Sequence, residues 1–239
     1  MNILMTREPF RGFVVGAAAC ALMVLWAGGC ASYRVDSSLQ PRKPAAKMPS
    51  AEHFRVTVVH FVTPTNVPGG GLPDFGVHQP SGEELRKRLM NAATNAYPAV
   101  FCDDEGAIPV EVTITRSANT TDMGGEACAS CLTLTILPLR SADKTDYTVQ
   151  VQVKDGPASE KLAAPITFSR EDTSWMSILP TGWIPVPGGK GARAWGLDSA
   201  IRKGGELTLA SCVEAMVTAI RRVDAETWQK VRASAAEEP

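Results

Sequence analysis

Six cysteines, at positions 20, 30, 102, 128, 131 and 212, are the residues of this chain most capable of chemistry. The sharpest local motif is Cys128-Ala-Ser-Cys131. A redox-active pair needs its first thiol at a helix N-terminus, where the helix dipole lowers the thiol pKa. Here the motif leads into segment 131–137, whose alternation predicts a strand. We therefore predict a structural disulfide between Cys128 and Cys131, with thiol–disulfide exchange as the alternative.

The other polar residues predict no metal centre, cofactor site or catalytic group. The only histidines are His53, His60 and His78, and the first two lie on opposite faces of one predicted strand. A zinc site at the cysteine pair would need a second pair of ligands. The glycine-rich segment around Lys190 lacks the spacing of a phosphate-binding loop, because Ile184 stands where the first glycine is required.

An apolar segment from Trp175 to Gly189 also contains prolines, which forbid a regular helix or a central strand. Two outcomes stay open for its large side chains. The segment either folds back and completes the core, or forms an exposed surface for a partner, a membrane or a small ligand. The candidate interface residues are Trp175, Trp183, Ile184, Lys190, Arg193 and Trp195.

The N-terminal residues have the order of a secretory signal peptide. Arg7 and Arg11 precede the apolar run Phe13–Trp26, and small residues follow that run. The run is shorter than the ~20 apolar residues that a membrane-spanning helix needs. Residues 1–29 are therefore predicted to be a cleaved leader.

The sequence Ala27-Gly28-Gly29-Cys30 resembles the lipobox of bacterial lipoproteins, although that family usually has Leu where Ala27 stands. The resemblance implies that the leader is cut before Cys30 and that Cys30 carries lipid. Several acyl chains would give a near-permanent membrane anchor. The family places an Asp after the cysteine in inner-membrane proteins, so Ala31 implies the outer membrane and a domain facing the periplasm. The alternative is an ordinary signal peptide with an incidental cysteine.

Residues 30–50 are predicted to be the lipidated N-terminus and a flexible tether, because Pro41, Pro44 and Pro49 with Arg42, Lys43 and Lys47 cannot build a core. Residues 51–239 are predicted to form a single domain. The chain carries 24 basic and 25 acidic residues. This near-neutral balance argues against a nucleic-acid partner and leaves the membrane and an envelope protein as the expected partners.

Alternating apolar residues predict an α+β fold, an antiparallel meander of five to six strands with two helices packed on one face. In the first strand, Phe54, Val56, Val58, His60 and Val62 are expected on the buried face. Ser81 and Glu84 form a capping box at the start of the first helix. The expected strands are 53–63, 109–115, 131–137, 147–153 and 164–169, and the expected helices are 81–97 and 206–232.

The strand Val56-Thr-Val-Val-His-Phe61, the helix with Leu85 and Leu89, and the strand at Val110 follow one another in this chain. This order resembles the small periplasmic fold of LpoB-, PelC- and TolB-N-terminal-type envelope lipoproteins. Together with the lipobox, it predicts an envelope lipoprotein that acts as a non-catalytic binding or assembly-accessory domain. The alternatives are a thiol–disulfide oxidoreductase that uses Cys128 and Cys131, and lipid or small-ligand handling through the segment from Trp175 to Gly189.

The cysteine pair gives a direct test. We expect Cys128 and Cys131 to resist alkylation after mild reductant, because structural disulfides of secreted proteins have low reduction potentials. Peptide mass spectrometry after alkylation measures this, and a denatured, fully reduced sample provides the control in which both thiols react. Alkylation of both cysteines in the native protein after mild reductant would instead favour the oxidoreductase.

Overall fold

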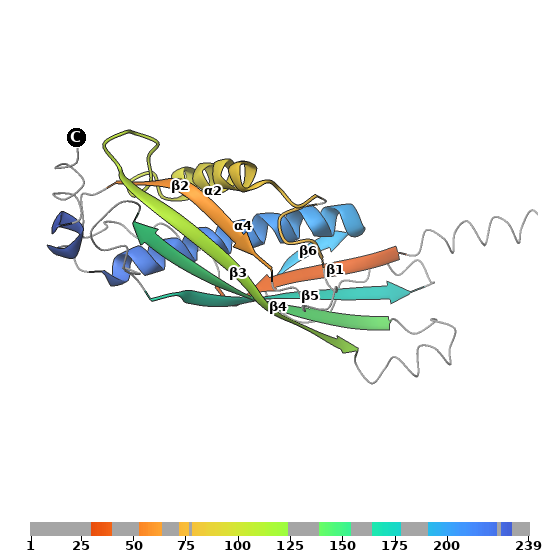
Figure 1. Ribbon diagram of the computed structural model, residues 1–239. Helices are drawn as coiled ribbons and strands as arrows, with labels where there is room; N and C mark the ends of the chain where they lie inside the picture. Colours follow the sequence, from red (N-terminus) through yellow and green to blue (C-terminus); the bar gives the residue numbers. More distant parts are fainter. Residues whose placement is uncertain are drawn as a thin grey trace, which may run out of the picture.

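The computed structural model describes residues 30–39, 53–63, 72–76, 78–123, 139–153, 164–177, 191–223 and 226–230. One six-stranded sheet, in the order β2-β3-β4-β5-β1-β6, is covered on one face by helices α2 and α4 (Figure 1). The elements are β1 Cys30–Ser37, β2 Phe54–Val62, α2 Gly82–Ala96, β3 Ile108–Met123, β4 Leu139–Val153, β5 Ile166–Ser177, β6 Ala192–Trp195 and α4 Leu197–Arg222.

The α+β class with two main helices is confirmed, but the antiparallel meander is wrong. Strands β3, β4 and β5 do pair antiparallel in sequence order. Strand β2 runs parallel to β3, because α2 connects them as a crossover. Alternation reports which face of a strand is buried and says nothing about its direction, so the sequence pattern could not reveal the mixed sheet.

The N-terminal segment differs most from expectation, because Cys30–Ser37 is a strand rather than part of a tether. Strand β1 pairs with β5 from Cys30↔Ser177 to Ser37↔Arg170, and its other edge pairs with β6. Val35 is completely buried. The tether prediction is therefore wrong for residues 30–37, which contain no proline, whereas residues 40–50 lie outside the described part of the chain.

Helix α2 forms as the sequence predicts. The Ser81 hydroxyl accepts a hydrogen bond from the backbone N–H of Glu84 at 3.2 Å, which satisfies one free donor of the first turn. Leu85 and Leu89 are buried against the core. The helix ends before Pro98, whose ring disfavours helical backbone in the preceding residue.

A β-bulge changes the predicted faces of β2. The register with β3 shifts between Val56 and Val58, so that Val59 points into the core with Phe54 and Val56. His60 is exposed, contrary to the expected buried face. One extra residue in a strand reverses every later side chain, which simple alternation does not anticipate.

Helix α4 begins at Leu197, before the expected start at Glu206. Gly204 and Gly205 lie inside the helix, where they lower its intrinsic stability and hide it from pattern reading. A Cβ at Gly204 would lie 3.3 Å from an Arg170 nitrogen, and one at Gly205 would lie 3.1 Å from the Phe75 backbone. The two glycines therefore allow other parts of the fold to approach the helix closely.

Arg170 on β5 is the largest fully buried side chain, and it joins three parts of the fold. Its guanidinium pairs with Asp172 at 2.7 Å and donates to the Thr208 hydroxyl of α4 at 2.9 Å. It also donates to the backbone carbonyl of Leu72 at 3.0 Å. Segment 72–76 is thus held against the sheet and α4 by a buried, hydrogen-bonded charge.

The adjacent carboxylate, Asp74, extends this network. It accepts a hydrogen bond from the Tyr147 hydroxyl and lies 3.4 Å from the Arg116 guanidinium. Burial raises the pKa of the Tyr147 phenol, which therefore remains a hydrogen-bond donor. The network links the polar groups that the fold buries between the sheet, segment 72–76 and α4.

Replacing Arg170 by Ala should lower the free energy of unfolding by ~3–5 kcal/mol, because Asp172 would remain buried without its partner. Urea unfolding followed by circular dichroism measures the change. The matched control is Arg202→Ala, which breaks the exposed pair with Glu206 and should cost less than ~1 kcal/mol. Equal effects of the two substitutions would contradict a structural role for the buried network.

Candidate functional site

Three neighbouring strands bring two of the predicted interface tryptophans close to Cys30. Ser32 on β1 lies directly opposite Trp175 on β5 and Trp195 on β6. Side chains directly opposite each other on antiparallel strands share a face of the sheet. The two indoles therefore flank Ser32 in one cross-strand row, two residues along β1 from Cys30.

This row lies on the sheet face that the helices leave uncovered. Ser37 of β1 contacts Ser211 of α4 through their hydroxyl oxygens, 2.8 Å apart, so the odd-numbered residues of β1 face the helix. Ser32 has the opposite orientation, because successive side chains of a strand alternate. We call the part of this face around Trp175, Trp195, Arg34 and Arg193 the Cys30-end surface. Ser32 and Thr173 on the same face are only 5% and 1% exposed, so the accessible side chains are those of β6.

The Cys30-end surface combines exposed apolar and basic side chains. Trp195 is 51% exposed, and Leu197, which follows it at the start of α4, is 53% exposed. Trp175 is half-buried, and Arg193 is exposed. Arg193 lies directly opposite Arg34 in the row next to the tryptophans. Such a surface can contact an amphipathic, negatively charged partner.

The structure revises the predicted apolar loop in one respect. Trp175 belongs to β5, which continues to Ser177, so the first residues of the segment are part of the sheet. Arg193 and Trp195 belong to β6. The remaining predicted residues, Trp183, Ile184, Lys190, Cys128 and Cys131, lie outside the described residues.

Two cysteines of the described segments, Cys102 and Cys212, are free thiols. Cys212 is fully buried within α4. Burial raises the pKa of its thiol, so it stays protonated and is a poor nucleophile. Within the described segments no group of three or more His, Cys, Asp or Glu side chains is arranged to hold a metal ion.

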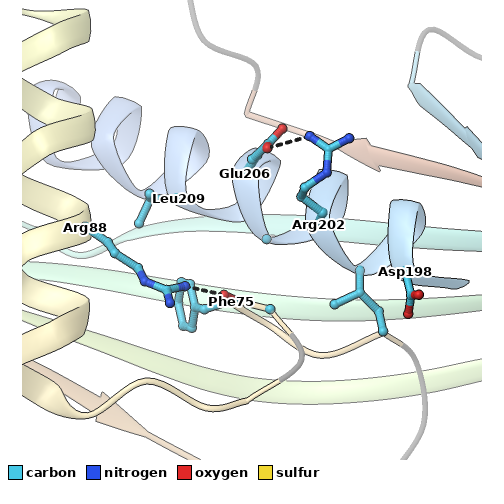
Figure 2. A pocket seen from close by; sticks show the side chains of 9 residues that line it. Phe75, Arg88, Asp198, Arg202, Glu206 and Leu209 are labelled. Carbon is cyan, nitrogen blue, oxygen red and sulfur yellow. Dashed lines mark hydrogen bonds and ion pairs between the residues drawn. The ribbon is translucent and has the colours of Figure 1, made fainter.

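A cavity of about 510 Å³ lies on the helix side of the fold, between α2, α4 and segment 72–76 (Figure 2). Its apolar lining comes from Phe75, Ile201 and Leu209, and charged groups stand around it. The Arg88 guanidinium donates to the Phe75 carbonyl at 3.1 Å on the α2 side. A cavity with this lining can hold a small amphipathic molecule. Sequence reading missed it because its residues come from three separate segments.

No described helix is long and apolar enough to cross a membrane. In the structure, a membrane attachment through Cys30 would act at the first residue of β1, beside Ser177 of β5. The geometry thus brings together the predicted lipid site and part of the predicted interface, which the sequence separates by more than one hundred residues.

Thiol reactivity tests the assignment of the free cysteines. In the native protein we expect a maleimide to label Cys102, which is half-buried, and to spare Cys212, because burial and a raised thiol pKa protect it. Time-resolved labelling with peptide mass spectrometry measures both rates, and in urea the two rates should converge. Equally fast native labelling would contradict the buried position of Cys212.

Comparison with known proteins finds little similarity. No protein-family profile matches the chain, and no curated protein matches it. Among solved structures, the chain is similar to a PelC dodecamer from Paraburkholderia phytofirmans, with 11% sequence identity and a TM-score of 0.26. The similarity covers 77% of this chain and 98% of that chain. A similarity this weak carries no argument about the function of this chain.

Proposed function

We propose that the protein is an outer-membrane lipoprotein of the cell envelope, anchored through Cys30, that acts as a non-catalytic binding or assembly-accessory domain. The observation that carries the proposal is the position of β1. This strand begins at Cys30 and pairs with β5 and β6 on its two sides. A lipid on Cys30 would therefore be attached directly to the folded sheet.

Direct attachment supports a binding or accessory role. Several acyl chains hold a protein at a membrane almost permanently. The side chains nearest the anchor then have a high effective concentration toward anything else at that membrane. Trp195 and Arg193, which are exposed close to Cys30 in the sheet, are of the residue types that anchor binding interfaces.

The buried charged groups support a structural rather than a catalytic use of the domain interior. Arg170 pairs with Asp172 and donates to the backbone carbonyl of Asp74, and Asp172 accepts a hydrogen bond from the Leu72 N–H. These contacts fix segment 72–76 to the sheet. The hydrogen-bonding capacity of these charged groups is directed to the protein itself. The redox alternative depends on Cys128 and Cys131 and stays a prediction.

The cavity between α2 and α4 favours a second candidate function, the handling of a small ligand. Its volume of about 510 Å³ lies within the range of small-molecule sites. Phe75 and Leu209 offer apolar surface, and the Arg202–Glu206 ion pair lies at the side of the cavity. A small molecule with both apolar and charged groups would fit this lining.

Acyl labelling in cells tests the anchor. The wild-type chain should incorporate labelled palmitate and lose residues 1–29, and Cys30→Ser should abolish both, because the serine hydroxyl cannot replace the acylated thiol. Labelling and the mass of the purified protein are the two readouts. Cys102→Ser, which removes a thiol far from the leader, should leave both unchanged. A wild-type chain without incorporated palmitate would contradict the proposed anchor.

A further inference from the structure

On the sheet face opposite the helices, the residue types change from row to row with distance from Cys30. The first row contains Trp175, Ser32 and Trp195. The next row on this face contains Thr173, Arg34 and Arg193. In the third row, Asp36 lies opposite Glu171. Aromatic, basic and acidic side chains therefore follow one another along β1.

The spacing of the rows matches the profile of a membrane surface. A strand advances ~3.3 Å per residue, so the tryptophan row lies about 7 Å from Cys30 and the arginine row about 13 Å. The interfacial layer outside the hydrocarbon is about 5–8 Å thick on each side of a bilayer. With β1 steeply inclined to the membrane, the exposed Trp195 indole would lie within this layer, where tryptophan is enriched, and the arginine row would lie just outside it.

The charges have the order that an anionic surface favours. Arg193 is exposed on β6 in the row next to Trp195, where an anionic headgroup would be attracted to its guanidinium. Lys203 of α4 donates to the backbone carbonyl of Arg193 and adds a second cation nearby. Asp36 and Glu171 stand one row further out, where repulsion by the surface is weaker.

The exposed apolar side chains point to the same end of the molecule. The exposed large hydrophobic residues of the described segments are Val62, Trp195 and Leu197. Trp195 and Leu197 are adjacent to Gly196, at the junction of β6 and α4 and beside the start of β1. Val62 lies away from them on β2, at the other edge of the sheet. Apolar exposure is thus concentrated beside the anchor.

From this arrangement we infer that the Cys30-end surface docks on an anionic phospholipid bilayer, with Trp195 in the interfacial layer and Arg193 just outside it, held near the surface by attraction to the lipid phosphates. The inference rests on the proposed acylation of Cys30, which brings this surface to the membrane. A lipid surface is favoured over a protein partner because the residue order is continuous with the anchor. The sheet then stands on the membrane in one orientation.

Fluorescence quenching by lipids tests the docking. The mature, acylated protein is reconstituted into vesicles of phosphatidylcholine and phosphatidylglycerol whose acyl chains carry bromine near the headgroup. Bromine should quench part of the tryptophan emission, and Trp195→Phe should remove most of the quenched part. The control Trp228→Phe, which changes a buried indole packed on Phe54, should leave the quenched part in place.

The charged row is tested with the same preparation. Arg193→Gln should reduce quenching in anionic vesicles and have little effect in pure phosphatidylcholine, because its guanidinium is attracted to the charged phosphatidylglycerol headgroups. Loss of one basic residue near an anionic surface corresponds to about a five-fold weaker docking equilibrium. Arg222→Gln removes the same exposed charge in the last turn of α4 and should change nothing.

Two outcomes would overturn the docking while the anchor stands. Acylated protein whose quenching is the same with and without Trp195 would place this surface away from the bilayer. Photo-crosslinking from position 195 to a protein in intact cells, without lipid quenching in vesicles, would assign the surface to a protein partner. If palmitate is not incorporated at all, the proposed function itself fails, and the labelling experiment reports that separately.

Discussion

The pairing of β1 between β5 and β6 is the interaction on which the rest of the structure depends. Strand β6 pairs with β1 alone, and β5 would become an edge strand if β1 were absent. The backbone groups of an unpaired edge are a liability that proteins must cover. Because β1 starts at Cys30, the residue proposed to hold the lipid is also the residue that begins the completion of the sheet.

A buried network joins this sheet to the helices. Arg170 bridges β5, segment 72–76 and α4, and Gly204 leaves the space that its guanidinium needs. Tyr147 of β4 and Asp74 continue the network beneath α4. Hydrogen-bonded polar networks of this kind favour one arrangement of the packed elements over others. The same packing forms one side of the cavity between the helices, because Phe75 and Gly205 approach each other closely and also line the cavity.

Single elements could be predicted where their information is local. The Ser81 cap, the buried Leu85 and Leu89, and the alternation from Val110 to Ile114 all appear as the residues indicate. The predictions were wrong where contacts with a segment distant in the sequence determine the local structure. In the sequence, Gly204 and Gly205 indicate a helix break, but in the structure they make room for Arg170 and Phe75 beside the helix. Residues Cys30–Ser37 resemble a tether in the sequence, but they form a strand because β5 and β6 pair with them.

The sequence by itself determined the α+β class, the capped helix and the residue types available for a membrane anchor and an interface. Those features depend on residues a few positions apart, because side-chain periodicity and helix-capping hydrogen bonds are local properties of the sequence. Only the tertiary structure decided that β2 and β3 are parallel, that β1 lies inside the sheet, and that Trp175, Trp195 and Arg193 gather beside Cys30. Strand order and register result from contacts between residues far apart in the chain, and no local pattern specifies them.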